Sequence, residues 1–345
     1  MKQKKIFLKQ SFVKLLNKLI SNKMIKYIFL SILILFFVIL IIMDYFRNHI
    51  KKRIGIIGLG HSQNVGNNLL KYAISIKLRE LGVIPYIIGM RYNKHNISFI
   101  SKVVNLRIIK KTFSEIKCND YDILMVNSDQ TWRNYKNRNV FDIAFLKFAK
   151  KCNIPKFVYA ASLGVNKWRY NKKEDKIAKY LLKNFTGISV REKCSIKLIE
   201  QHLGIKPIFA LDPTLLINKK YYLNLIKNYK NDIIIDNTYI FIYMVRNNSK
   251  RFRNIYNCKG VVTNSFHGTI FSIIFNKPFI SYTNNINYDA RFSSLKEIFN
   301  ISNRIIDISS TPDYRLLEIP LNINKSLLNS LKANSINLYS LIPLV

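Results

Sequence analysis

From residue 54 onwards, short apolar stretches alternate with longer amphipathic stretches, and this alternation limits the possible folds more than any other feature. Residues 54–58 and 84–88 are each predicted as a strand. Between them lie a Gly/Asn-rich loop and a segment whose apolar residues recur near the helical period, with Gly82 as its C-cap. A strand–loop–helix–strand unit of this kind is typical of an open parallel sheet with helices on its faces.

The same alternation continues along the chain. Further strands are predicted at 122–126, 156–160, 187–190, before Asp212-Pro213, at 238–245, at 260–263 and after Pro278, and further helices at 174–184, 192–203, 249–258 and 290–301. Sequential units predict an α/β fold with two doubly wound, Rossmann-like halves. We expect an N-terminal half at 54–186, a C-terminal half at 187–310 and a tail at 311–345. Too few residues separate Val245 from Val261 for a full strand–helix–strand unit of about 30 residues, so we expect the second half to be shortened.

An uncharged apolar run covers residues 27–43, between Lys26 and Asp44. Its length is at the short end of a bilayer-spanning helix, which needs about 17–25 residues. We therefore expect a transmembrane or membrane-anchor helix. The preceding segment 1–26 has many lysines and no acidic residue, and it predicts a basic amphipathic segment that could lie on an anionic leaflet.

The orientation of this segment is left open, because Arg47, Lys51, Lys52 and Arg53 make the second flank basic as well. A monotopic or re-entrant anchor would keep both flanks on one side. We expect a membrane-anchored protein whose main domain lies on the cytoplasmic side of the inner or plasma membrane.

The net charge of +37 favours anionic partners, although uniform enrichment in Lys, Ile and Asn is also what base-composition drift produces. The basic residues are spread evenly and no known binding module is present, so no nucleic-acid partner is expected. The four cysteines are far apart in sequence, without ligand spacing. We expect reduced thiols, and neither a zinc site nor a disulfide framework.

Polar clusters follow nearly every predicted strand. They lie at 60–67, 127–132, 161–164, 191–192, 212–214 and 264–268. Ligands of open α/β sheets bind at the carboxyl ends of the strands, so these clusters predict an active cleft.

The first cluster contains Asn64, Gly66 and Asn67 at the start of a helix. Exposed amides at a helix N-terminus bind anions or sugar hydroxyls. Its glycine spacing is not that of the dinucleotide fingerprint. The alternative is a loop whose Gly and Asn residues only serve the turn.

The second cluster, "NSDQTW", contains Ser128, Asp129 and Gln130 with Trp132 beside them. A carboxylate, an amide and an aromatic face together suit the recognition of a sugar. Capping of a helix by Ser128 or Asp129 is the alternative.

Arg191 follows the strand at 187–190, and arginine binds carboxylates and phosphates with two hydrogen bonds. A surface arginine paired with Glu192 is the alternative. Asp212 precedes a proline, and we expect it to cap the next helix.

The stretch "TNSFHGT" places Ser265, His267 and Gly268 between a strand and a helix. Asn264 or Ser265 is expected as the cap, and Gly268 allows a close approach to the backbone. The positive end of the helix favours a neutral imidazole at His267, which can polarise or protonate a ligand.

Six stretches in order resemble the polysaccharide pyruvyl transferase family. They are "NVGNNLLKYAISIKLRELG", "YDILMVNSDQTW", "VYAASLG", "ISVREKCSIKLIEQHLGI", "LDPTLL" and "VVTNSFHGTIFSIIFNKPFI". The resemblance covers residues 54 to about 300.

The resemblance implies a fold like that of the GT-B glycosyltransferases and transfer of a pyruvyl group from phosphoenolpyruvate to a sugar diol. The acceptor would be a glycan or a lipid-linked oligosaccharide of the cell surface. His267 would be the acid or the phosphate contact, and Arg191 would hold the donor. Ser128, Asp129 and Gln130 would face the acceptor or bridge the domains. No metal or organic cofactor is implied, because phosphoenolpyruvate is itself the donor substrate.

This sequence departs from the family pattern at Ser265, where an arginine often stands, and at Asn127, where glycine is usual. Two alternatives stay open beside the transferase: a non-catalytic member of the family, and a glycosyltransferase of similar architecture that uses a nucleotide sugar.

Overall fold

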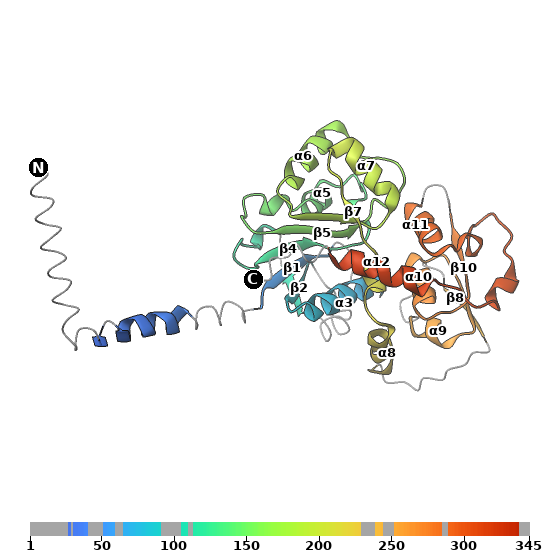
Figure 1. Cartoon of the computed structure of the whole chain (residues 1–345). Coiled ribbons are helices and arrows are strands. Elements are labelled where there is room, and N and C mark those ends of the chain that lie inside the picture. Colours follow the sequence, from blue (N-terminus) through green and yellow to red (C-terminus); the bar gives the residue numbers. More distant parts are fainter. Residues whose placement is uncertain are drawn as a thin grey trace, which may run out of the picture. The chain divides into compact units, whose positions relative to one another are not determined.

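The computed structural model describes residues 27–28, 30–40, 51–58, 65–90, 105–109, 113–228, 239–243, 252–284 and 289–337 (Figure 1). The chain divides into two compact units, residues 1–51 with Val345, and residues 52–344. The second unit contains every strand of the described ranges.

In the first unit, residues 27–28 and 30–40 are helical and exposed. Within the described ranges, no helix is both long and apolar enough to cross a membrane. The expected membrane helix at 27–43 is therefore not confirmed. Residues 41–43 and the basic segment 1–26 lie outside the described residues.

The larger sheet has seven parallel strands in the order β3-β2-β1-β4-β5-β6-β7. Its strands are β1 (Arg53–Ile57), β2 (Ile84–Met90), β3 (Asn105–Ile109), β4 (Ile123–Val126), β5 (Lys156–Ala161), β6 (Gly187–Val190) and β7 (Ile208–Phe209). The expected boundary between residues 186 and 187 lies inside this sheet, because β6 pairs with β5.

The smaller sheet has four parallel strands in the order β11-β10-β9-β8. These are β8 (Ile240–Tyr243), β9 (Gly260–Thr263), β10 (Phe279–Thr283) and β11 (Ile305–Asp307). The two parallel sheets confirm the α/β class. The second sheet has fewer strands because one short helix, α9 (Phe252–Asn257), is the only described helix between β8 and β9.

The remaining helices connect the strands or follow them. They are α3 (Val65–Glu80), α5 (Arg138–Ala144), α6 (Lys172–Leu182), α7 (Lys193–Leu203), α8 (Lys219–Asn228), α10 (Phe266–Ile274), α11 (Ala290–Phe299) and α12 (Lys325–Asn337), with short 3₁₀ turns η2 (Gln130–Trp132) and η4 (Pro213–Leu215). In Figure 1, α5, α6 and α7 cover one face of the larger sheet and α3 lies on the other.

Alternation along the strands explains this layering. Ile56 of β1 and Met125 of β4 belong to the core beneath α3, whereas Ile57 and Val126 belong to the core beneath α5, α6 and α7. Successive side chains of a strand point to opposite faces, so strands covered on both faces are apolar throughout. The core beneath α3 also contains Phe271 and Phe279, so it continues into the smaller sheet.

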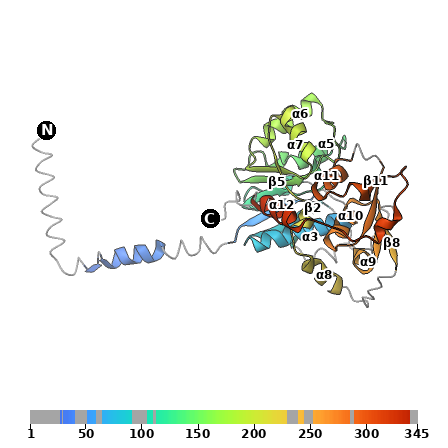
Figure 2. The same cartoon turned by 45° about the vertical axis from the view of Figure 1, so that its right-hand side comes forward.

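The tail expected at 311–345 contains α12, which returns to the larger sheet. The backbone N–H of Leu211, just after β7, donates to the Ser335 hydroxyl at 2.9 Å. Figures 1 and 2 both show α12 beside α3, and Lys332 of α12 is close enough to Lys77 of α3 for their charges to interact.

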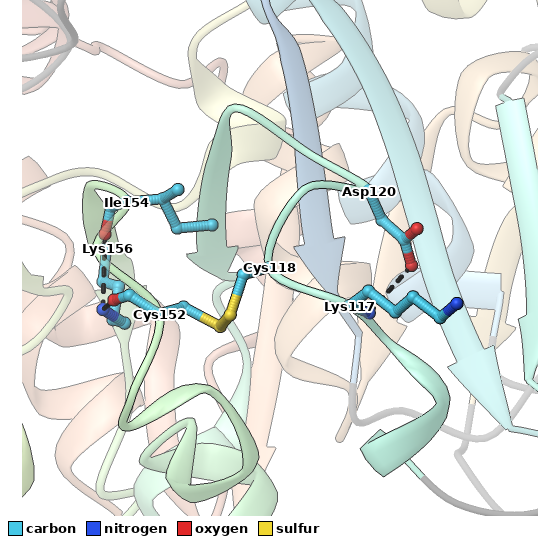
Figure 3. Close-up of a disulfide and its surroundings, with 6 residues drawn as sticks. All are labelled: Lys117, Cys118, Asp120, Cys152, Ile154 and Lys156. Atoms are coloured by element: carbon cyan, nitrogen blue, oxygen red, sulfur yellow. Dashed lines mark hydrogen bonds between the residues drawn. A yellow bond between two sulfur atoms is a disulfide. The ribbon is translucent and has the colours of Figure 1, made fainter.

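Cys118 and Cys152 form a disulfide, so the expectation of reduced thiols is wrong for this pair (Figure 3). They precede β4 and β5, which are neighbours in the sheet, and their Cα atoms lie 5.2 Å apart. Cys194 and Cys258 are free. Distance along the sequence did not reveal that two adjacent strands bring the two loops together.

Candidate functional site

The candidate site lies at the carboxyl ends of the larger sheet. Gly58, Asp129 and Arg191 follow β1, β4 and β6, and parallel strands place such residues at one edge. His267 comes to the same edge from α10 of the smaller sheet and lies 3.9 Å from Asp212. The structure therefore brings together residues from four of the predicted clusters.

Arg191 is buried, with 2% of its side chain exposed. Nη1 donates to Asp212 Oδ2 at 2.6 Å, Nε to Glu192 Oε1 at 3.3 Å, and Nη2 to Asp129 Oδ1 at 3.4 Å. A surface ion pair, the alternative for this residue, is excluded by its burial. The described hydrogen bonds of its guanidinium all go to carboxylates of the protein itself.

The charges around Arg191 stabilise one another. Burial alone would lower the pKa of Arg191, but Asp212, Glu192 and Asp129 outweigh it and raise that pKa. Burial would raise the pKa of Asp212, yet Arg191 and then His267 hold it below its ordinary value. For Glu192, burial outweighs the guanidinium and the pKa is raised. Three carboxyl groups thus surround one guanidinium.

The ring of Phe266, at the start of α10, lies close to two arginines. The guanidinium carbon of Arg191 is 4.7 Å from its ring centroid, and that of Arg291 is 5.4 Å away. Arg291 also makes a two-point ion pair with Asp289, at 2.6 and 3.0 Å. The stacked cations fix Phe266, and with it the first turn of α10 that carries His267.

His267 is the second residue of α10, whose cap is Ser265 as expected; the Ser265 hydroxyl accepts from Gly268 N at 3.1 Å. The Nε2 atom of His267 is buried and has no hydrogen-bond partner. Burial lowers the pKa of His267, and Asp212 and then Asp129 oppose that effect in part. Burial thus favours the neutral form of the ring, which has an unused polar nitrogen near a carboxylate.

The backbone of Gly66, at the start of α3, lies against the His267 ring. A Cβ at residue 66 would lie 2.3 Å from His267 Nδ1, a distance that real Cβ atoms do not adopt. The glycine is thus required by the imidazole, a role that the turn alone did not predict.

Asp129 has a strained backbone, with φ of 99° and ψ of −175°. Its carbonyl accepts from Ser162 N at 2.9 Å and Thr131 N at 2.6 Å, which holds that conformation. Non-glycine residues adopt such angles mainly at functional sites. The Asp129 side chain makes no capping hydrogen bond, so the capping alternative does not apply, and 26% of the side chain is exposed.

The side chains of Ser128, Gln130 and Trp132, the sequence neighbours of Asp129, are held by contacts within the protein. The Ser128 hydroxyl donates to Ala160 O at 2.7 Å and is buried. Gln130 Oε1 accepts from Arg133 at 2.6 Å and contacts the position of Gly164. Trp132 is stacked on Phe145 within the core, so the predicted aromatic face for a sugar is not available there.

Four further residues were singled out from the sequence: Asp212, Gly268, Asn67 and Asn64. Asp212 caps η4 through Thr214 N at 3.0 Å, as expected, and also pairs with Arg191. A Cβ on Gly268 would lie 2.7 Å from Thr263 Oγ1, so the close approach there is from the smaller sheet itself. Asn67 is buried in the first turn of α3. Asn64 lies outside the described residues.

Lys71 is a charged residue of this region that the sequence analysis missed. It lies on α3 with 2% of its surface exposed, and a Cβ on Gly58 would be 2.8 Å from its Cε. Burial lowers the pKa of Lys71 to about 8, against the opposing charge of Asp129. The helical period could have predicted this burial, because Lys71 shares a helical face with the buried Ile74 and Leu78.

No group of three His, Cys, Asp or Glu side chains in the described part of the chain is arranged to hold a metal ion. The cluster of one histidine, one buried lysine, two arginines and four carboxyl groups is suited to moving protons and to binding a polar ligand.

Solved structures support the fold. UDP-GlcNAc 2-epimerase from Methanocaldococcus jannaschii aligns with a TM-score of 0.53 at 12% identity, covering 84% of this chain and 99% of that one. A glycosyltransferase from Rickettsia africae aligns with a TM-score of 0.45 at 11% identity, covering 86% and 96%. The alignment with the epimerase fits the expected α/β architecture with parallel sheets. No curated protein sequence matches this chain significantly.

The family model of the polysaccharide pyruvyl transferases matches residues 64–286, more than half of the chain. The matched region begins just before α3 and extends beyond β10, and so contains Lys71, Asp129, Arg191, Asp212 and His267. The chain belongs to the polysaccharide pyruvyl transferase family.

Proposed function

We propose that this chain transfers a pyruvyl group from phosphoenolpyruvate to two hydroxyl groups of a sugar, forming a cyclic ketal on a cell-surface glycan or its lipid-linked precursor. The observation that carries the proposal is the buried, unpartnered Nε2 of His267 beside Asp212, in a layer with Asp129 and Arg191. A family member with this arrangement has a positioned proton carrier, which this chemistry requires.

The reaction needs two proton movements. Protonation of C3 of phosphoenolpyruvate makes C2 electrophilic, one acceptor hydroxyl adds to C2, phosphate leaves, and the second hydroxyl closes the ring. Of the two hydroxyl protons, one ends on the new methyl group and one on phosphate. His267 transfers the proton that ends on the new methyl group. Asp212 Oδ2, 3.9 Å from His267 Nε2, stabilises the imidazolium while that proton is on the ring.

The acceptor is assigned to Asp129. Its carboxylate is partly exposed and does not cap η2, so it can accept a hydrogen bond from a sugar hydroxyl and align it for attack. Ser128 and Gln130 support this residue from either side rather than contacting the sugar, because their side chains bond to Ala160 and Arg133. No organic cofactor takes part in this proposal.

The test is acceptor-dependent release of phosphate from phosphoenolpyruvate by the full-length chain, with the ketal identified by mass spectrometry. His267→Gln should lower the rate by about 10²–10⁴-fold, the usual contribution of a positioned acid or base. His202→Gln is the matched control, because His202 stacks on Trp168 away from the cluster, and it should keep the wild-type rate. Equal rates for wild type and His267→Gln would overturn the assignment of His267.

A non-catalytic family member is the second candidate, and two observations favour it. Arg191 is occupied by three carboxyl groups, and the described residues give the smaller sheet four strands against seven in the larger. A folded wild-type chain that binds no phosphoenolpyruvate would establish this reading and exclude the transferase.

We infer membrane association as well, from the uncharged run at 27–43 and the basic segment before it. Such a segment binds an anionic leaflet through apolar burial and lysine charge. The full-length chain should float with vesicles containing anionic lipid, whereas a chain beginning at Lys51 should stay in the soluble fraction. Equal flotation of both would contradict this role.

We place the main domain on the cytoplasmic side, because both flanks of the apolar run are basic and a cytoplasmic site has access to a metabolic donor. The Cys118–Cys152 pair provides the test, because cytoplasmic thiols are kept reduced. Rapid acid quenching of cells, followed by alkylation under denaturing conditions that expose the buried Cys258, should label all four cysteines. Protection of Cys118 and Cys152 from alkylation would place the domain in an oxidising compartment instead.

A further inference from the structure

Tyr135 is an exposed aromatic residue in the connection between η2 and α5. It is 53% exposed, whereas Trp132, just before it in the chain, is 1% exposed and stacks on Phe145. The aromatic face expected for a sugar is therefore buried at Trp132 and exposed at Tyr135. A single exposed tyrosine is ordinary on a protein surface, so its surroundings decide whether it has a role.

The surroundings of Tyr135 place it at the candidate site. Burial, and then the charge of Asp129, raise the pKa of the Tyr135 hydroxyl, and Arg133, Arg291 and Arg191 oppose this rise in part. The guanidinium carbon of Arg133 lies 5.8 Å from the centroid of the Tyr135 ring. Asp129 and Arg191 follow strands of the larger sheet, whereas Arg291 lies on α11, after the third strand of the smaller sheet. Charged groups associated with both sheets thus act on this one side chain.

The segment that carries Tyr135 is held on both sides. Before it, Asn134 Nδ2 donates to Arg169 O at 2.9 Å, and Asn134 Oδ1 accepts from Lys136 N at 2.7 Å. After it, the Asn137 side chain caps α5. A side chain on a backbone fixed in this way loses little conformational entropy when a ligand packs on it, which favours binding.

The chemistry around the ring matches a sugar. A pyranose ring has an apolar face of C–H groups and a rim of hydroxyl groups. The Tyr135 ring offers a flat apolar surface, and the carboxylate of Asp129, with 26% of its side chain exposed, accepts hydrogen bonds from hydroxyls. Arg133 is fixed beside the ring, because its Nη1 donates to Gln130 Oε1 at 2.6 Å. An aromatic face with a few placed polar groups is the usual composition of a small-molecule site.

We propose that the exposed ring of Tyr135 is the surface on which the acceptor sugar stacks, with the hydroxyls of the sugar directed toward Asp129. The chemical class of ligand is a neutral pyranose. Its role as the acceptor of a pyruvyl group rests on the proposed function, whereas stacking on Tyr135 is a binding property that needs no donor. Tyr135 is a binding residue that positions the sugar and takes no part in proton transfer.

The experiment is saturation-transfer NMR of the full-length chain with the methyl pyranosides of glucose, galactose and mannose, and separately with UDP. We expect wild type to bind at least one of the three sugars. Tyr135→Leu keeps an apolar side chain but loses the flat ring, so it should bind that sugar about tenfold more weakly. Tyr135→Phe keeps the ring and should bind within about twofold of wild type.

A second readout does not depend on removing the ring. In a chain labelled with 3-fluorotyrosine, the fluorine resonance that is missing from Tyr135→Phe belongs to Tyr135. Addition of the bound sugar should shift this resonance. A resonance that stays in place while the sugar binds would overturn the proposal.

Tyr180→Leu is the matched control. Tyr180 is 63% exposed on α6, which covers the outer face of the larger sheet (Figure 1), and its replacement should leave sugar binding unchanged. Both leucine variants should keep the wild-type unfolding midpoint, because both positions are exposed. Sugar binding by Tyr135→Leu equal to that of wild type, or no binding of any of the three sugars by wild type, would overturn the proposal. Binding of UDP that depends on Tyr135, without binding of a sugar, would assign the ring to a nucleotide base and overturn it as well.

Turnover separates this proposal from the proposed function. With phosphoenolpyruvate in excess, Tyr135→Leu should raise the KM for the acceptor about tenfold and leave kcat within about twofold, because it removes uniform binding. Sugar binding that depends on Tyr135, without any release of phosphate, supports the stacking surface and contradicts the transferase. Turnover with an unchanged acceptor KM in Tyr135→Leu supports the transferase and overturns the role of Tyr135.

Discussion

Arg191 and Lys71 are two buried cations at the same edge of the larger sheet, and their surroundings are opposite. Arg191 follows β6 and bonds to Asp212, Glu192 and Asp129. Its pKa is raised, because these acids outweigh the desolvation that comes with burial. Lys71 follows β1 in the chain, and burial outweighs the effect of Asp129, so its pKa falls to about 8.

The difference separates a cation that its neighbours stabilise from one whose charged form burial disfavours. The charge of Arg191 is balanced within the protein and holds together residues from the ends of β4, β6 and β7. The charge of Lys71 is costly in the folded protein, because burial disfavours the ammonium form. Sites that bind ligands commonly keep such a cost, because optimising stability alone would remove it.

The largest predicted effect is the loss of unfolding free energy when Arg191 is replaced. Arg191→Met leaves the buried carboxyl groups of Asp212 and Glu192 without their guanidinium. Removal of one partner of a buried ion pair costs about 3–5 kcal/mol of unfolding free energy. Urea unfolding at pH 7 should show this loss, and the loss should shrink as the pH falls and the two carboxyl groups become protonated.

Arg315→Met is the matched control, since Arg315 also makes a two-point pair, with Asp313 at 2.8 and 2.9 Å, but is exposed. It should leave the unfolding midpoint unchanged. If Arg191→Met were as stable as wild type, Arg191 would not be structural and the comparison would fail.

Lys71→Met should change stability in the opposite direction. The pKa of Lys71 falls from 10.5 to about 8 in the folded chain, so between these values the unfolded chain binds more protons and wild-type stability rises with pH. At pH 7 the buried charge costs about 3 kcal/mol. The variant should therefore be more stable than wild type at pH 7 by up to that amount, with the difference gone near pH 10.5. A less stable variant at pH 7 would make Lys71 structural.

Much of the fold was predictable from the sequence, because apolar strands and amphipathic helices differ in period. The strands at 187–190 and 260–263 have the predicted bounds, and the helix over 290–301 was predicted within two residues of α11. The sheet that a strand joins was not predictable: β6 reads as the start of a new half, yet hydrogen bonds pair it with β5.

The candidate site was predictable in position but not in charge balance. The strand ends indicated Asp129, Arg191 and His267 correctly as neighbours at one edge. Which carboxylates neutralise Arg191 depends on side-chain directions that no local pattern encodes. The same is true of Trp132, whose ring turns into the core, and of the cysteines that meet across β4 and β5.

Gly66→Ala tests how tightly α3 and α10 are coupled next to Lys71. The added methyl group would overlap the His267 ring, at 2.3 Å from Nδ1, and overpacking of this kind costs about 1–3 kcal/mol. Urea unfolding of both single variants and of Gly66→Ala with His267→Ala measures the coupling. The double variant should recover the stability that Gly66→Ala loses, because the overlap is gone. An equal cost of Gly66→Ala with and without the ring would mean that the two residues are not in contact.

The smallest predicted effect concerns the titration of His267. Its charge interacts with Asp212 and Asp129, the same two carboxyl groups that bond to Arg191. Burial lowers the pKa of His267 below its ordinary 6.5, so just below pH 6.5 the unfolded chain binds more protons than the folded chain. Wild-type stability should therefore fall as the pH drops from 7 through this window. His267→Gln should show a flatter dependence of the unfolding midpoint on pH, whereas His202→Gln should follow wild type. A wild-type stability that rises on acidification would mean that Asp212 outweighs burial, and His267 would then be a charged partner of the Arg191 cluster rather than a neutral proton carrier.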